Sequence, residues 1–485
     1  MAEARTDSAA WRQPSADQDP EIEHQLEHAR RRHLLLDPRY PLELGKDVID
    51  PMIHTGRMFW MLLAIFGGLF LMYLITWGYQ MVNGLGITGL SRPVFWALYI
   101  VNFVYFVGVG HAGTFISAAL RVLRIEWRRP IARAAELVTL FGLGAAAMFP
   151  LVHLGRAWKF YWLAPIPNER QLWPNFHSPL VWDFFAISTY LTGSALFVFL
   201  SLLPDLAMVR DHTTGWRKIL YGLVALGWRG TEREWAHLET AQNIFSYVII
   251  PVMFSVHTIV SYDFAMAIQP GWHSTIFGPY FIIGALFSGV GAVILAMILI
   301  RKGMHLEYFI REEHFDGMAK FLLILSFGWA YFYFNDYIVT WYGNMPVDRA
   351  IADMMEKGWA SPFWYVMLVS NILIPWVILW NKRWRTNLWI LAFVCVFVQV
   401  GMYLERWIIV PVTLGRNYLP FDWGIYYPHL PETIITIGAF AMVFFLYLLA
   451  SRFIPLIPVW EVQEGQMLQG LRRIGRAVLP TRVEH

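Results

Sequence analysis

Four ionisable side chains that stand far apart in the sequence share one setting, because each lies at the end of a long hydrophobic run. They are His153, Asp183, Asp263 and Arg406. A charged group inside lipid costs about 2.5–3.5 kcal/mol on insertion scales, so such a residue indicates a functional site. Taken singly, each is explained by a helix-end charge that reaches toward water, or by a local ion pair such as Arg406 with Glu405. If successive runs cross a membrane in alternating directions, however, all four residues reach the same face, and this coincidence favours one shared site.

The chemistry that uses such a set is the oxidation of a quinol. A hydroquinone gives up two electrons and two protons, so each hydroxyl group needs a proton acceptor beside it. A buried carboxyl group or a histidine, which titrates near neutral pH, can be that acceptor, and an arginine can keep a carboxylate ionised or polarise a carbonyl oxygen. Such a site must be apolar and open to lipid. Aromatic residues flank both aspartates: Trp182, Phe184, Phe185, Tyr262 and Phe264.

Further polar residues on the same runs form a second tier of candidates. His257 precedes Asp263 by six residues, so the two differ by about 120° around a helix and do not share a face. A packing role is the alternative for His111, which stands among small residues, and a helix-end charge is the alternative for Glu136 and Asp205. The candidates for secondary contacts to quinol are His257, Glu405 and Tyr190; those for a proton path are His111, Thr114, Glu136 and Asp205; weaker ones near the outer face are Asp336, Glu432 and His177.

Composition indicates the element type that positions these residues. Of the 485 residues, 57% are hydrophobic and 15% charged, and the mean hydropathy is +0.44, which is typical of a multi-pass membrane protein. About 20 apolar residues are needed to cross the hydrocarbon core. Ten runs qualify: 58–82, 94–120, 132–153, 182–209, 240–268, 275–301, 318–343, 360–381, 386–410 and 430–453. We therefore expect an all-α polytopic membrane protein with ten transmembrane helices.

The distribution of basic residues predicts the orientation. Of the 38 Lys and Arg residues, 30 fall in the two terminal segments and in every second connection. Because cytoplasmic segments carry the basic excess, both termini are expected in the cytoplasm. We divide the chain into a polar amino-terminal tail and surface segment (1–57), a ten-helix membrane domain (58–453) and a cytoplasmic carboxyl-terminal tail (454–485).

Several sequence patterns match known binding motifs, but their context does not support the corresponding function. The stretch 84–89 matches a dinucleotide-binding fingerprint, but no strand precedes it, so it is expected to be a loop. The basic run 121–133 is better explained by orientation and anionic lipid than by nucleic acid. Cys395 is the single cysteine, and the embedded histidines 111, 153 and 257 are expected at different depths. We therefore expect no metal site, haem or iron–sulfur cluster on this chain.

Several segments together carry a family resemblance. Residues 110–117, followed by the basic Arg128-Arg129-Pro130, resemble the second helix of NrfD-like (polysulfide-reductase-type) membrane subunits. Further segments extend the resemblance: 149–156, 178–183, 256–264 and 403–406. Length, ten runs and the long polar amino-terminal extension are most similar to the quinol-oxidising membrane subunits of alternative complex III, a bacterial quinol:electron-acceptor oxidoreductase.

The resemblance implies a fold, a site and partners. It implies two four-helix bundles, formed by helices 2–5 and 6–9, with helices 1 and 10 beside them, and a quinol site in the first bundle (about 94–268) near the outer surface. It assigns the quinol-site positions to His153, Asp183, Asp263 and Arg406. The implied substrate is menaquinol or another quinol, and the implied membrane is the bacterial inner membrane. The implied partners are a peripheral iron–sulfur protein, multihaem and monohaem cytochrome c subunits and a homologous ten-helix subunit. Two alternatives stay open within such a complex, a proton-translocating subunit and a structural anchor without a quinol site; a transporter is a more distant one.

Overall fold

Among the residues that the structure describes, ten helices are long and apolar enough to cross a membrane, and they form the body of the protein. The computed structural model describes residues 44–467, 471–474 and 477–480. The ten spanning helices are α3 (Arg57–Asn83), α4 (Leu98–Val122), α5 (Ala132–His153), α6 (Pro179–His212), α8 (Glu232–Ala265), α9 (Phe277–Gly303), α10 (Glu312–Gly343), α12–α13 (Ser361–Leu379), α15 with its π-helical end η7 (Leu388–Val412) and α16 (Leu430–Ala450). The predicted all-α fold with ten spans is therefore confirmed. Most of the predicted tail 1–57 and part of 454–485 lie outside the described residues.

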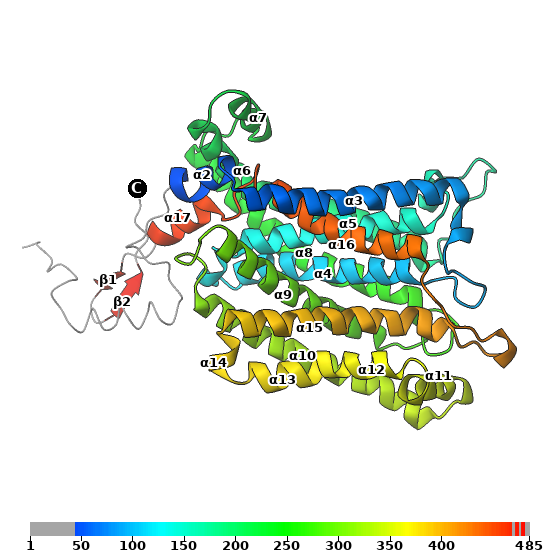
Figure 1. Ribbon diagram of the computed structural model, residues 1–485. Helices are drawn as coiled ribbons and strands as arrows, with labels where there is room; N and C mark the ends of the chain where they lie inside the picture. The colour runs from blue at the N-terminus through cyan, green and yellow to red at the C-terminus, as the bar shows by residue number, and fades with distance from the viewer. Residues whose placement is uncertain (1–43, 468–470, 475–476, 481–485) are drawn as a thin grey trace, which may run out of the picture.

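The helices run side by side, so the bundle has two ends (Figure 1). One end carries α2 (Asp50–Ile53), α7 (Trp216–Val224), α14 (Lys382–Arg385) and α17 (Val459–Met467). We call it the arginine-rich end, after Arg121, Arg124, Arg128 and Arg129. The opposite end, called here the loop end, carries the connections 154–178, 266–276, 344–360 and 413–429. Helices α6 and α8 have 34 residues each, or about 51 Å. They therefore exceed the ~30 Å hydrocarbon core, and α7, which lies between them in the chain, projects away from the side of the bundle at the arginine-rich end.

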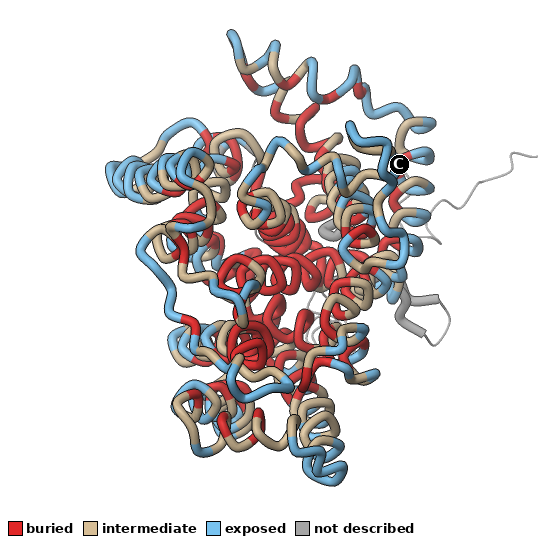
Figure 2. Tube along the Cα trace, turned by 90° about the vertical axis from the view of Figure 1, so that its right-hand side faces the viewer, coloured by how far each residue is buried: buried red, intermediate tan, exposed pale blue. Residues whose placement is uncertain are grey.

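Helix α4 lies at the centre of the molecule, and its residues are almost all buried (Figure 2). It contacts α5, α8 and α9, while α6 contacts both α5 and α8, so α4, α5, α6 and α8 close a ring. Helices α9, α10, α12–α13 and α15 contact one another in the same cyclic way. Helix α3 packs mainly on α16, at the edge of the molecule, and only Tyr73 and Gln80 of α3 are buried.

Small residues allow α4 to approach its neighbours closely. A Cβ atom on Gly113 would lie 1.8 Å from the Ala135 carbonyl oxygen of α5. On α9, a Cβ atom on Gly289 would lie 2.4 Å from the Ala112 Cβ atom of α4. Small residues at helix crossings are typical of membrane bundles, where packing rather than the hydrophobic effect holds helices together. These glycines therefore allow α4 to pack directly against α5 and α9 along the part of the helix that carries His111.

The stretch 84–89 is a loop between α3 and α4 that contains the short 3₁₀ helix η3 (Leu85–Ile87). A Cβ atom on Gly89 would lie 2.1 Å from the Tyr427 carbonyl oxygen. The Gly89 backbone N–H donates to the Glu432 carboxylate at 2.7 Å, which also accepts from Tyr426 Oη at 2.7 Å. The close approach of the Tyr427 backbone explains why residue 89 is a glycine. The hydrogen bonds give Glu432, which was predicted as a weak site candidate, a structural role.

Some elements were not expected. Helix α11 (Pro346–Lys357) lies in the connection between the predicted runs 318–343 and 360–381, with Ile351, Ala352 and Met354 buried. In the carboxyl-terminal tail, β1 (Leu471–Ile474) pairs antiparallel with β2 (Ala477–Pro480). The remaining short elements are η2 (Leu44–Ile49), η4 (Glu126–Arg128), η5 (Ala157–Leu163), η6 (Val369–Leu373) and η8 (Pro420–Asp422). Pro375 lies two residues after the end of η6, and Pro411 lies inside η7. A π turn accommodates the N–H group that proline lacks.

Candidate functional site

Asp183 and Asp263 meet at the loop end of the α4–α5–α6–α8 ring. Asp183 stands in the first turns of α6 and Asp263 in the last turn of α8, and their side chains lie within hydrogen-bonding range of each other. One oxygen of each carboxyl group is buried and has no partner among the described residues. Two carboxylates this close are costly to ionise together, whereas a carboxyl–carboxylate pair can share a proton in a hydrogen bond. The unpartnered oxygens are the unusual feature, because buried polar atoms are nearly always hydrogen-bonded.

His153 ends α5 at the same end of the ring. Its Nδ1 atom is buried and has no hydrogen-bond partner in the described chain. The residue before it, Val152, accepts a 2.9 Å hydrogen bond from the Gln80 side chain, which ties the end of α5 to α3. His153 thus shares their end of the ring, and within the described residues no hydrogen bond, ion pair or ring contact joins it to the two aspartates.

Arg406 lies on α15, between the ring and the second group of helices. It is 2% exposed, forms an ion pair with the adjacent Glu405, and places its guanidinium 5.1 Å from the centre of the Phe281 ring on α9. Gly284, one turn further along α9, leaves room for it, since a Cβ atom there would lie 3.1 Å from Nη2. Arg406 interacts electrostatically with His257. It is thus brought near the ring but not into contact with the aspartate pair.

Glu405 faces away from the ring. The Trp329 indole of α10 donates a 2.8 Å hydrogen bond to Glu405 Oε1, and the side chain is 1% exposed. Successive helix residues differ by about 100° in direction, which explains why Glu405 reaches α10 while Arg406 reaches α9. The local ion pair between Arg406 and Glu405, which was the alternative explanation for Arg406, is therefore present, and both side chains are buried.

A second polar group fills the middle of the ring. The His111 and His257 rings lie 4.5 Å apart, and the Tyr190 ring lies 4.9 Å from that of His111. The Tyr190 hydroxyl donates to the Gly110 carbonyl at 3.3 Å and lies near the Thr114 hydroxyl. Both nitrogens of His111 face carbonyl oxygens, Nδ1 that of Val107 at 2.6 Å and Nε2 that of Met253 at 3.1 Å.

This contact corrects one expectation. His111 and His257 were expected at different depths, but their rings touch. The ends of α4 and α8 are not level in the bundle, so the distance of a residue from its helix end does not give its depth.

A third polar group lies toward the arginine-rich end and centres on Arg133, which is fully buried. It forms ion pairs with Glu136 at 3.4 Å and with Asp205 at 3.1 Å. Glu136 also accepts hydrogen bonds from Ser117 Oγ at 2.7 Å and Ser201 Oγ at 2.8 Å. Glu136 and Asp205 are thus buried partners of an arginine rather than the helix-end charges that were the alternative.

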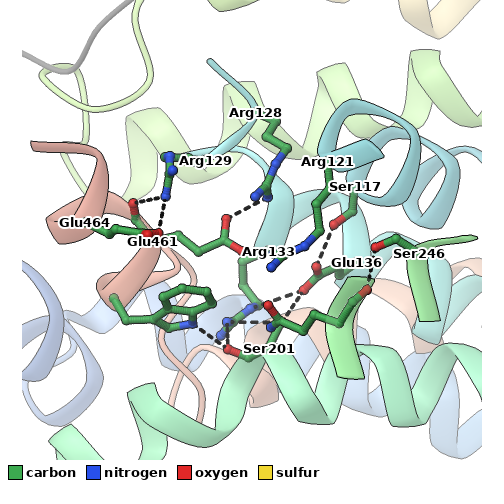
Figure 3. A network of polar contacts seen from close by, with 12 residues as sticks. Ser117, Arg121, Arg128, Arg129, Arg133, Glu136, Ser201, Ser246, Glu461 and Glu464 are labelled. Carbon is green, nitrogen blue, oxygen red and sulfur yellow. Dashed lines mark hydrogen bonds and ion pairs between the residues drawn. The ribbon is translucent and has the colours of Figure 1, made fainter. Parts of the chain in front are cut away.

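The carboxyl-terminal helix α17 covers this group (Figure 3). Asp205 accepts hydrogen bonds from the backbone N–H groups of Val459 at 3.2 Å and Trp460 at 3.0 Å, the first turn of α17. Glu461 forms ion pairs with Arg128 at 2.7 Å and Arg121 at 3.3 Å. Burial alone would raise the pKa of Glu461, but these arginines hold it below its ordinary value.

Arg133 and Glu461 are the residues whose roles sequence reasoning missed. Arg133 belonged to the basic run attributed to orientation and lipid, and a signal was present, because it lies inside an apolar run three residues before Glu136. No comparable signal marks Glu461, whose partners stand more than 300 residues earlier in the chain. In the described parts of the chain, no group of three or more His, Cys, Asp and Glu residues could hold a metal ion.

A family model described as "Polysulphide reductase, NrfD" matches residues 86–415. The chain is 26% identical to a putative dimethyl sulfoxide reductase membrane protein, the C subunit, of Halobacterium salinarum, over 62% of this chain but only 61% of that protein. It is 22% identical to the C subunit of the selenate reductase of Mesobacillus selenatarsenatis, over 79% of this chain and 91% of that subunit. It is 21% identical to the Hdr-like menaquinol oxidoreductase integral membrane subunit of Archaeoglobus fulgidus, over 80% of this chain and 91% of that subunit.

Proposed function

Because this chain belongs to the NrfD (polysulphide reductase) family, we propose that it binds and oxidises a quinol at the Asp183–Asp263 pair, as a subunit of an alternative complex III-type oxidoreductase. Its relatives are named as membrane subunits of reductase and oxidoreductase complexes, which supports a role within a larger assembly. The Archaeoglobus relative is named as a subunit of a menaquinol oxidoreductase, and we propose menaquinol as the substrate of this chain as well.

One observation carries the proposal. The two carboxyl groups lie within hydrogen-bonding range of each other. No N–H or O–H group of the described residues reaches the buried Oδ1 atom of either carboxyl group, and the buried His153 Nδ1 atom at the same end of the ring likewise has no partner there. A hydroquinone has two hydroxyl groups that can donate to such acceptors. An aspartate pair that shares one proton can accept a second proton. The unprotonated nitrogen of a neutral His153 ring can accept another. These acceptors match the two protons that quinol releases with its two electrons.

The remaining assignments follow from this site. The 30-to-8 distribution of basic residues supports an outer position for the loop end, in the cytoplasmic membrane of a bacterium. The two electrons then leave through an iron–sulfur protein docked on that end, and the complex also holds multihaem and monohaem cytochrome c subunits and a homologous ten-helix subunit. Large exposed side chains of the 154–178 connection, Trp158, Leu172 and Trp173, are available for such docking. We assign Arg406 to polarising the quinone head group from the α9 side.

The substitution Asp183→Asn tests the proposal. It removes a proton acceptor and replaces one hydrogen-bond acceptor with a donor, but it keeps the shape of the side chain. Quinol oxidation by the whole complex should therefore be lost while the complex still assembles. Asp336→Asn is the matched control. Asp336 is a largely buried aspartate near the loop end of α10, but its carboxylate is satisfied by a 2.8 Å hydrogen bond from Ser274 Oγ. Normal turnover in Asp183→Asn would remove this carboxylate from the mechanism.

Proton translocation is a second candidate function, favoured by the three polar groups that follow one another through the ring. The aspartate pair, the His111–His257–Tyr190 group and the Arg133–Glu136–Asp205 group lie in that order from the loop end. His111 is the central member, because a ring with both nitrogens facing carbonyl oxygens can carry its proton on either side. In proteoliposomes, His111→Leu should keep quinol oxidation but lower the number of protons that appear per quinol to the two that the quinol itself releases, if the ring conducts protons. An unchanged ratio of protons to quinol would exclude that role.

The structural-anchor alternative is separated by a direct analysis of lipophilic cofactors. Quinone should be extractable from the purified complex and depleted in the Asp183→Asn variant. A complex that oxidises substrate but whose quinone content does not respond to this substitution would assign the site to another subunit.

A further inference from the structure

The basic run between α4 and α5 lines a cavity at the arginine-rich end. The cavity has a volume of about 520 Å³ and lies between the end of α4, the 122–129 connection, α8 and α17. Its lining contains four arginines: Arg121, Arg124, Arg128 and Arg129. We propose that this cavity binds the phosphate of an anionic phospholipid.

Charge and chemistry favour a phosphate. Two carboxylates also line the cavity, those of Glu239 and Glu464, and Glu461 lies beneath it, paired with Arg121 and Arg128. The lining therefore keeps an excess of positive charge. Arg124 is exposed, and its side chain has no hydrogen bond or ion pair within the described part of the chain. Guanidinium groups bind phosphate oxygens through paired N–H donors.

The surroundings favour a lipid over free phosphate. The cavity lies where the apolar part of α4 ends, which is the level of lipid head groups. On α8, Tyr247 lines the cavity, and Ile244 and Val248 beside it are exposed; on the other side, Leu123 is exposed next to Arg124. These apolar side chains can support acyl chains while the phosphate enters the cavity, and an interfacial tyrosine is typical of this level.

The structure also divides the basic run by role. Arg133 is held inside the ring by Glu136 and Asp205, and Arg128 holds α17 through Glu461. Arg124 is thus the arginine whose replacement leaves the described ion pairs intact. A bound phosphate would contact Arg124 and Arg121 and would link the lipid to the α17 contact through Arg121.

Lipid retention by the whole complex tests the proposal. The complex is placed in nanodiscs of phosphatidylcholine with a minor fraction of phosphatidylglycerol, and retained lipids are counted by native mass spectrometry. Arg124→Gln should bind phosphatidylglycerol about fivefold more weakly, and Arg124→Lys should lose less. Arg233→Gln on the exposed first turn of α8 should have no effect, whereas Glu239→Gln should strengthen binding.

The remaining arms separate the possible outcomes. Added inorganic phosphate at millimolar concentration should not displace the lipid. Displacement of the lipid by inorganic phosphate, or equal retention of phosphatidylcholine and phosphatidylglycerol, would overturn the lipid assignment. Equal loss in Arg124→Gln and Arg233→Gln would show that general surface charge, not this cavity, attracts the lipid. Thermal unfolding of each variant verifies that the fold is intact.

Discussion

Asp183 of α6 and Asp263 of α8 lie within hydrogen-bonding range of each other at the loop end of a four-helix ring. The two helices contact one another directly, which brings together residues from separate membrane crossings. In the proposed function, this pair would accept hydrogen bonds and protons from a bound quinol. The proposed oxidation of quinol depends on this pair.

Replacing Asp263 should separate binding from chemistry. Asp263→Asn still hydrogen-bonds to Asp183 but cannot hold the shared proton. We expect kcat for quinol oxidation to fall about 10²–10⁴-fold, the usual contribution of a positioned proton acceptor, with little change in KM. The Asp183→Asn/Asp263→Asn double variant should be no worse than either single variant, because residues that act as a unit are not additive. Multiplied defects in the steady-state rates of the double variant would mean that the aspartates act separately.

The α4–α5 crossing should tolerate no side chain at Gly113. Gly113→Ala places Cβ against the Ala135 carbonyl oxygen and the Thr139 hydroxyl, and such overpacking costs about 1–3 kcal/mol or more. Gly144→Ala on α5 is the control, since a Cβ atom there meets no atom within 4 Å. Thermal unfolding in detergent should show a lower midpoint for Gly113→Ala alone. Equal midpoints for both variants would contradict the close crossing.

Removing one member of the Glu405–Arg406 pair should destabilise the protein more than removing both. Both side chains are nearly inaccessible to solvent, and breaking a buried pair from one side typically costs about 3–5 kcal/mol because a charge is left uncompensated. We expect Arg406→Gln to lower the unfolding midpoint and Glu405→Gln/Arg406→Gln to recover most of the loss. Quinol oxidation should stay low in both the single and the double variant if Arg406 polarises the quinone. Full activity in the stable double variant would leave Arg406 with a structural role only.

The spans were predictable because length and hydropathy alone define a membrane helix. The convergence of Asp183 and Asp263 was also predictable, since alternating crossings place both at one face. The partners of individual side chains were not. His111 meets His257, and Arg133 meets Asp205, only because particular helices are neighbours with particular rotations, and hydropathy specifies neither. Helix α11 was missed because its apolar positions are interrupted by charged ones, so it does not stand out by hydropathy.

Docking of α17 should weaken in acid. The folded-state pKa of Glu461 is depressed below its ordinary value of 4.5. Its contribution to docking is therefore complete above pH 4.5 and is lost as pH falls through the lower folded-state pKa. Limited proteolysis should cleave the carboxyl-terminal segment faster in acid than at neutral pH. Glu461→Gln should be cleaved quickly at both pH values, whereas Glu464→Gln, whose carboxylate is half exposed, should behave nearly as the unaltered protein. A pH-independent cleavage rate in the unaltered protein would contradict the role of Glu461.

The central claim is tested most directly by an experimental density map of the complex with a bound quinone-site inhibitor. We predict the head group at the loop end of the α4–α5–α6–α8 ring, within hydrogen-bonding distance of the Asp183 or Asp263 carboxyl group. A head group located elsewhere, with the two aspartates contacting only each other, would contradict the account.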